Sequence, residues 1–354
     1  MSDEDVSDAH LGLGKSRKPA TDDRNYALDV MKGLLVAGMV LAHTIQFLNG
    51  RDSSLLRLGS HFINLVSFSG FLFCFGYACW IAYFSRARLP TSRILSTALK
   101  CYGAFVVSGL ALLVLLRNEP LSLQLVWSVV LVRNLPAYSE FLLAFALVIL
   151  IAALCAKAVR YLANNLTLLL GFSIAMLVLA WFVPDAPSVD PVVGALIGGG
   201  DFSYFPALTY SPIFLAGAYL AAKPAVPTRW IVGIGLATFS LFVLAWIAGF
   251  GVERFPPEPI WIVSSFGASL LYFVLSGWLV KTLPMAASNV LIAIGQNSLG
   301  YLVLSNLTLF VVAQSYARSL SWQNTLIAYA LVMALIRFVL WITVQPKTRR
   351  KVVL

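Results

Sequence analysis

The chain has 354 residues, of which 60% are hydrophobic and only 11% are charged, and its mean hydropathy is +0.85. A soluble protein of this length could not bury so much apolar surface, so the composition predicts an all-α, polytopic integral membrane protein. The apolar runs are continuous and do not alternate with polar residues, which argues against a transmembrane β-barrel. The net charge of +10 does not indicate nucleic-acid binding, because the basic residues are distributed as membrane topology requires.

In chain order, residues 1–23 are polar and rich in Asp, Ser and Lys, which predicts a disordered cytoplasmic tail. Residues 24–345 form the transmembrane domain, and residues 346–354 form a basic cytoplasmic tail. The segment 121–132 is apolar but too short to span, so an interfacial or re-entrant helix is expected there. About ten spans are predicted, at 26–48, 62–84, 101–116, 139–156, 165–183, 204–221, 230–249, 259–280, 290–313 and 324–344.

The basic residues predict the orientation of the chain. With the amino terminus inside, the cytoplasmic segments hold seventeen of the 25 Lys and Arg residues, the opposite face holds six, and Lys32 and Arg337 are expected to be buried in spans. This bias places both termini in the cytoplasm. On the outer face, the irregular loops 184–203 and 250–258 suit a lid or an acceptor surface, although plain connectors would look much the same.

The first span carries three ionisable residues, Asp29, Lys32 and His43. Each costs roughly 2.5–3.5 kcal/mol inside a bilayer, so a functional role is expected. Lys32 and His43 share a helix face about 16 Å apart, and Asp29 lies one turn before Lys32. His43 lies toward the outer leaflet, where it is either a general base or a hydrogen-bonded packing residue. Lys32 either meets an anionic donor or pairs with Asp29.

A second basic cluster lies in the cytoplasmic loop between the second and third spans and contains Arg86, Arg88, Arg93 and Lys100. Such side chains attract the phosphates of a nucleotide-bearing donor, and the alternative is ordinary topology with anionic lipid binding. Arg24 precedes the first span and either joins the phosphate contacts or snorkels to lipid headgroups. The four cysteines lack metal-ligand spacing, so neither a metal site nor a disulfide is expected.

Four short motifs resemble the membrane-bound acyltransferase-3 family over residues 24–344. The opening Arg24-x4-Asp29-x2-Lys32-Gly33-x9-His43 is similar to the basic residue and histidine, ten residues apart, that open the family, in the Lys-Gly variant of its sugar and exopolysaccharide O-acetylases. Residues 67–72, Ser-Phe-Ser-Gly-Phe-Leu, resemble the second-span segment of the family, and residues 86–100 resemble its Arg-rich donor loop. Residues 294–301 resemble its late Leu-Gly-x-x-Ser-x-x-x-Tyr segment.

The chain departs from the family pattern on the acceptor side. Ser305 stands where the late segment of the family continues to a histidine, and Tyr301 comes one residue early. Glu140 and Phe141 match only part of the Glu-x-x-Phe-Tyr pattern of many members.

The resemblance implies an acetyl-CoA-dependent O-acyltransferase of a bacterial cytoplasmic membrane, without a metal. It would transfer an acyl group, most simply acetyl, from cytoplasmic acyl-CoA to a hydroxyl of an extracytoplasmic or lipid-linked glycan. The basic loop, Arg24 and Lys32 would bind the donor, and His43 would act as general base or carry the acyl group transiently. Glu140 heads a span on the outer side and is expected to orient the imidazole. Membrane lipids and further copies of the chain are the other expected partners.

Two alternatives remain open from the sequence. A transporter or flippase of a lipid-linked glycan would use the same helices and intramembrane charges without acyl chemistry. Transfer of succinyl instead of acetyl would keep the site assignments unchanged.

Overall fold

The computed structural model describes residues 25–50, 53–182, 190–199, 204–250 and 252–343, and these residues are helical apart from loops and one isolated bridge. The two predicted tails and Arg24 lie outside the described residues. The elements are the α-helices α1 (Tyr26–Leu48), α2 (Ser54–Cys79), α3 (Thr91–Ala111), α4 (Leu123–Val130), α5 (Glu140–Leu154), α6 (Ala156–Asn164), α7 (Leu166–Phe182), α8 (Pro191–Ile197), α9 (Ala207–Ala222), α10 (Thr228–Ile247), α11 (Pro259–Thr282), α12 (Met285–Gln296), α13 (Ser298–Tyr316) and α14 (Trp322–Thr343), with π-helical turns η1 (Trp80–Phe84) and η2 (Leu112–Leu116) extending α2 and α3.

Seven of the described helices are long and apolar enough to cross a membrane, or eight if α5 and α6, which meet at a 91° bend, form one span. The prediction of an all-α chain with many membrane-length helices is therefore confirmed at this level. Each of the ten predicted spans overlaps a helix, but α7 and α9 have only 17 and 16 residues. The short segment 121–132 contains α4, a helix of eight residues.

The prediction of one continuous span at 290–313 was wrong, because the helix breaks at Asn297 between α12 and α13. The side-chain amide of Asn297 donates to the carbonyl of Ala293 at 2.9 Å. Asn side chains compete in this way with the backbone bonds of a helix. Both helices pack on α1, but the break turns α13 so that it also packs on α3 and α14.

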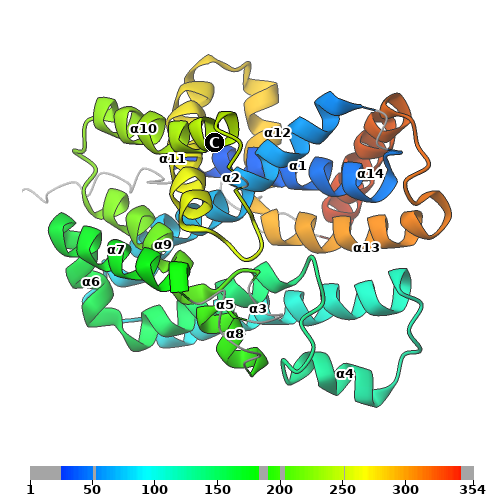
Figure 1. The fold of residues 1–354 in the computed structure, drawn as a ribbon, viewed down its shortest axis with the longest axis horizontal. Coiled ribbons are helices and arrows are strands. Elements are labelled where there is room, and N and C mark those ends of the chain that lie inside the picture. The colour runs from blue at the N-terminus through cyan, green and yellow to red at the C-terminus, as the bar shows by residue number, and fades with distance from the viewer. Residues whose placement is uncertain (1–24, 51–52, 183–189, 200–203, 251, 344–354) are drawn as a thin grey trace, which may run out of the picture.

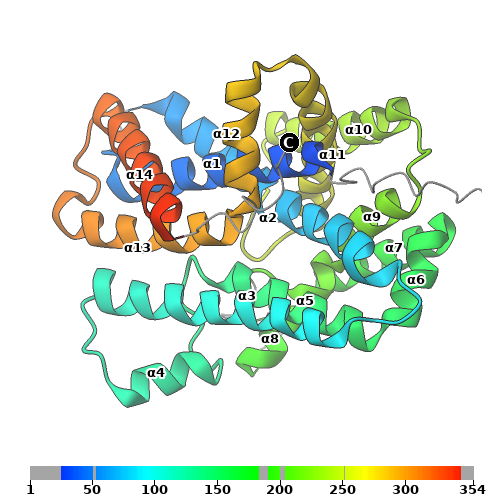
Figure 2. The same ribbon diagram turned by 180° about the vertical axis from the view of Figure 1, so that it is seen from behind.

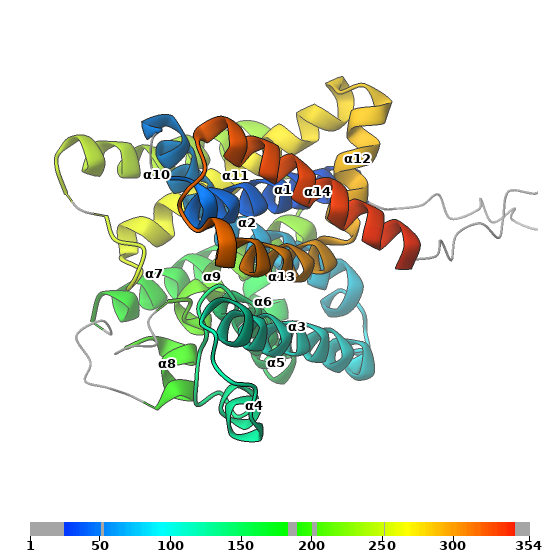
Figure 3. The same cartoon turned by 90° about the vertical axis from the view of Figure 1, so that its right-hand side faces the viewer.

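The helices are arranged in two tiers (Figures 1, 2 and 3). One tier contains α1, α2 and α10–α14, and the other contains α3–α6 and α8. The tiers meet where α9 packs against α2 and α6, and where α13 packs against α1 and α3. Helix α1 lies at the centre of the first tier, with α2, α11, α12, α13 and α14 all packed against it.

Helix α1 packs against α12 with the two backbones in contact. A Cβ atom added to Gly33 would overlap the carbonyl oxygen of Leu291, and one added to Gly295 would overlap that of Asp29. Only glycine permits so close an approach at these two positions. The segment that opens the sequence motif and the late segment at 294–301 therefore pack against each other.

At the other end of α1, backbone hydrogen bonds join residues 47–50 to residues 318–320, a contact that we call the α1–α13 clamp. The amides of Arg318 and Leu320 donate to the carbonyls of Phe47 and Leu48, each at 2.9 Å, and the amide of Gly50 donates back to Leu320 at 2.9 Å. The clamp holds the end of α13 beside the end of α1, so that a side chain about one turn before it on α1 can meet one about three turns before it on α13.

Candidate functional site

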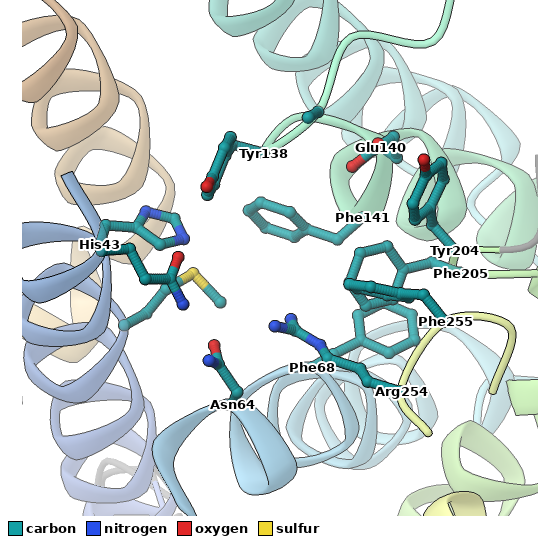
Figure 4. A pocket seen from close by; sticks show the side chains of 13 residues that line it. His43, Asn64, Phe68, Tyr138, Glu140, Phe141, Tyr204, Phe205, Arg254 and Phe255 are labelled. Carbon is teal, nitrogen blue, oxygen red and sulfur yellow. The ribbon is translucent and has the colours of Figure 1, made fainter. Parts of the chain in front are cut away.

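A cavity of about 290 Å³ lies beside the carboxyl-terminal half of α1 (Figure 4). Five segments of the chain contribute to it: α1, α2, the start of α5 with the loop before it, the loop before α9, and the loop before α11. Its lining residues are Met39, His43, Gln46, Asn64, Phe68, Ala137, Tyr138, Glu140, Phe141, Tyr204, Phe205, Arg254 and Phe255. The lining is largely aromatic, with a few polar groups directed inward, as is typical of small-molecule sites.

His43 is 8% exposed, and its ring is held in place by contacts on two sides. Nδ1 of His43 lies 3.2 Å from Oδ1 of Asn306 on α13, and the ring meets Tyr138 edge-on with centroids 5.1 Å apart. The amide nitrogen of Asn306 donates to the carbonyl of Tyr138 at 3.2 Å, which leaves its oxygen to accept from His43. The proton of the neutral imidazole is then on Nδ1, and the lone pair on Nε2 is free for general-base chemistry.

Tyr138 contributes to this arrangement through its backbone as well as its ring. Its φ angle of 63° is in the left-handed region, which non-glycine residues rarely adopt. In this conformation, the backbone carbonyl of Tyr138 accepts a hydrogen bond from Asn306 and the ring of Tyr138 packs on His43. Burial raises the pKa of the Tyr138 hydroxyl, so the phenol is neutral at physiological pH.

The structure brings Glu140 into the same cavity, as part of the first turn of α5. Glu140 is 8% exposed. The His43 imidazole meets Asn306, however, so the orienting contact predicted for Glu140 is made by an amide from α13. An acidic residue at a helix amino terminus is also a favourable arrangement for the helix itself.

Arg254 enters the cavity from the loop before α11, opposite His43 (Figure 4). Its guanidinium carbon lies 4.5 Å from the ring centroid of Phe255 and 5.6 Å from that of Phe205. Burial lowers the pKa of Arg254, but arginine remains a cation throughout the physiological range. Arg254 lies in the loop 250–258, which the sequence indicates as a candidate acceptor surface without singling out this residue.

A second cavity of about 290 Å³ adjoins the first and is more polar. The two cavities share Gln46, Asn64 and Tyr138. The second is also lined by Arg57 and Arg318, close to the clamp. The two cavities therefore form one polar region at the end of the molecule where α1 ends.

The remaining predicted residues lie at the opposite end of α1. Nζ of Lys32 lies 2.7 Å from Oδ1 of Asp29, which is the pairing alternative from the sequence. The side chain of Lys32 is 23% exposed and that of Asp29 is 5% exposed. Arg337 lies on α14, one of the membrane-length helices, and its side chain is exposed because α14 packs through one face only.

The basic loop lies at this same end. Asn25, just before α1, donates to the hydroxyl of Tyr77 near the end of α2, and the loop follows α2 and η1 (Figure 2). Arg86 and Arg88 lie in this loop, but Arg93 and Lys100, which were predicted to belong to it, lie on α3, and all four side chains are exposed. Arg160 of α6, which the sequence did not single out, donates to the carbonyls of Phe84 at 2.9 Å and of Arg86 and so holds the loop backbone.

The predicted site is thus divided between two ends of the protein. His43 and Glu140 line one cavity, whereas Asp29, Lys32 and the basic loop lie at the other end of α1. Comparison of the chain with models of known protein families, with curated proteins and with solved structures found no match. Asn306 had a signal in the sequence, since an amide inside an apolar segment requires a polar partner.

Proposed function

We propose that the protein is a membrane-embedded O-acyltransferase, with His43 as the general base. One observation carries the proposal: Nδ1 of His43 is engaged by Asn306 while the ring lines a cavity large enough for a substrate group. This is the arrangement in which a base is fixed in one tautomer by a third group. A histidine that served only for packing would not need an accessible cavity beside it.

In the proposed reaction, Nε2 of His43 removes the proton from an acceptor hydroxyl. The oxygen then attacks the carbonyl carbon of the thioester, the carbon–sulfur bond breaks, and the imidazolium returns the proton to the departing thiolate. Asn306 stabilises the imidazolium through its Oδ1, because a hydrogen bond to a charged donor is stronger than one to a neutral donor. Atoms and charges balance without a metal or redox partner.

The donor in this proposal is cytoplasmic acyl-CoA, most simply acetyl-CoA. The exposed basic loop offers side chains to the CoA phosphates, and the pair of Lys32 and Asp29 lies on the way to His43. Lys32 and His43 are eleven residues apart on one helix, which corresponds to about 16 Å. The extended pantetheine arm must cover this distance.

The acceptor is a hydroxyl of an extracytoplasmic or lipid-linked glycan. The aromatic side chains around the cavity suit the apolar faces of sugar rings. The proposal also includes ten membrane crossings with both termini in the cytoplasm, in the cytoplasmic membrane of a bacterium. This requires the shorter helices α7 and α9 to span, and reporter fusions at residues 90, 195 and 350 test the orientation.

The test is acyl transfer by the purified protein in lipid nanodiscs. Radiolabelled acetyl-CoA and a membrane glycan fraction are supplied, and O-acetyl esters on the glycan are counted for wild type and for His43→Ala. Label should enter the glycan only with the wild type. If the lipid-linked glycan crosses the membrane while acetyl-CoA remains unconsumed, the flippase alternative holds and acyl transfer is rejected.

A further inference from the structure

Arg254 is the one arginine or lysine among the described residues that line the His43 cavity, and the proposed acyl transfer assigns it no role. Among the described residues, no carboxylate lies within ion-pair distance of its guanidinium. Two aromatic rings, those of Phe205 and Phe255, contact the guanidinium instead. Figure 4 shows the guanidinium directed across the cavity toward the wall that carries His43 and Asn64.

The aromatic contacts leave the hydrogen-bonding edge of Arg254 free. A guanidinium over an aromatic ring interacts through its face, while its five N–H groups point outward in the plane. That planar edge matches a carboxylate, which it can bind through two parallel hydrogen bonds. A cation fixed in a largely apolar cavity is costly unless an anion is supplied.

Glu140 does not supply that anion directly. Its side chain lines the same cavity, but no ion pair within 4 Å joins it to Arg254 among the described residues. The anion that this cation requires must therefore come from a ligand.

We propose that Arg254 binds a carboxylate carried by a substrate and thereby selects an acidic substrate over a neutral one. The carboxylate belongs either to an acidic sugar of the acceptor or to the far end of a dicarboxylic acyl group. That this ligand is a substrate rests on the proposed acyl transfer. In either case the molecule is held at two points, with the carboxylate at Arg254 and the reacting hydroxyl or carbonyl near His43.

The test compares two matched pairs of probes in binding assays on the full chain in nanodiscs. Methyl β-glucuronide is compared with methyl β-glucoside by saturation-transfer NMR, and succinyl-CoA is compared with acetyl-CoA by calorimetric titration. The pair that shows a preference identifies the source of the carboxylate. In that pair the acidic probe should bind wild type at least about tenfold more tightly.

Arg254→Gln should bind the acidic probe and the neutral probe of that pair with nearly equal affinity. The preference should persist in Arg133→Gln, which removes the same charge from an exposed position that lines neither cavity. If Arg254→Gln does not fold, Arg254→Lys replaces it, and the preference should fall severalfold because lysine keeps the charge but loses the planar fork. Equal binding within both pairs by wild type, or a preference that survives the Arg254 variants, would overturn the proposal.

The binding assays are repeated on His43→Ala, which cannot turn over substrate. A preference that depends on Arg254, found together with no acyl transfer by the wild type, would reject the proposed function and retain the carboxylate site. Acyl transfer without any acidic preference would reject the carboxylate site and retain the proposed function.

Discussion

Asn306 offers the sharpest test of the geometry around His43. Its Oδ1 accepts from Nδ1 of His43 at 3.2 Å, and its amide nitrogen donates to the carbonyl of Tyr138 at 3.2 Å. Asn306→Ala removes both bonds. The bond to His43 is worth about 0.5–1.5 kcal/mol while the imidazole is neutral, and about 1.5–3 kcal/mol once it is protonated. The difference of about 1–1.5 kcal/mol acts only in the transition state and corresponds to roughly tenfold in rate.

Loss of the preferred tautomer adds to this effect, because an unheld imidazole no longer keeps its lone pair on Nε2. We therefore expect kcat of Asn306→Ala to fall about 10- to 100-fold, with the KM for acetyl-CoA nearly unchanged. Asn306→Asp keeps the acceptor but loses the donor to Tyr138, so it should retain more activity than the alanine variant.

The assay is single-turnover transfer of label from acetyl-CoA to the glycan fraction. The matched control is Ser305→Ala on the same helix, since the hydroxyl of Ser305 is 1% exposed but bonds the carbonyl of Leu302 within α13. This control should behave as wild type. A well-folded Asn306→Ala protein with a kcat within twofold of wild type would refute the assignment of Asn306 as the group that positions His43.

Three further predictions follow from the same contacts. His43→Ala should lose at least about 100-fold in kcat while calorimetry still detects acetyl-CoA binding at the wild-type affinity, and residual turnover near the wild-type rate would contradict the base assignment. Replacing Arg86 and Arg93 together by Gln should raise the KM for acetyl-CoA with little change in kcat, and equal CoA affinities in two folded samples would exclude a donor role for the loop. Gly33→Ala should lower stability by about 1–3 kcal/mol, seen as a lower melting temperature in nanodiscs, because its Cβ overlaps the backbone of α12. Gly171→Ala, where nothing lies within 4 Å of an added Cβ, is the control and should melt as wild type.

Much of the helix pattern could be predicted from hydropathy, because membrane-length apolar runs have few alternative structures. The helix break at Asn297 could not be predicted, because a single Asn is tolerated in many helices. The structure shows the break, where the Asn297 side chain bonds the carbonyl of Ala293. The exposed side chain of Arg337 also could not be predicted, because hydropathy locates a span but does not say which face packs against the protein.

The candidate site could be predicted only where its residues share one helix. Asp29 and Lys32 are one turn apart, so their pairing followed from helical geometry. Asn306 and Arg254 reach His43 from segments more than 200 residues away in the chain. Such contacts depend on which helices are neighbours, and no local spacing contains that information. The prediction that Glu140 lies near His43 agrees with the cavity that both residues line. It could be made because the sequence shows Glu140 at the start of an apolar span.

Because the α1–α13 clamp fixes the ends of both helices, the number of residues between the clamp and each side chain matters as much as the identity of the side chain. His43 lies four residues before Phe47, and Asn306 lies twelve residues before Arg318. These two separations bring the side chains of His43 and Asn306 into contact. One residue added or removed on either side would rotate a partner by about 100° and shift it by about 1.5 Å along its helix. Insertions and deletions should therefore be tolerated far less between 306 and 318 than in the loop between α9 and α10, which lines neither cavity, even though much of the former segment is ordinary apolar helix.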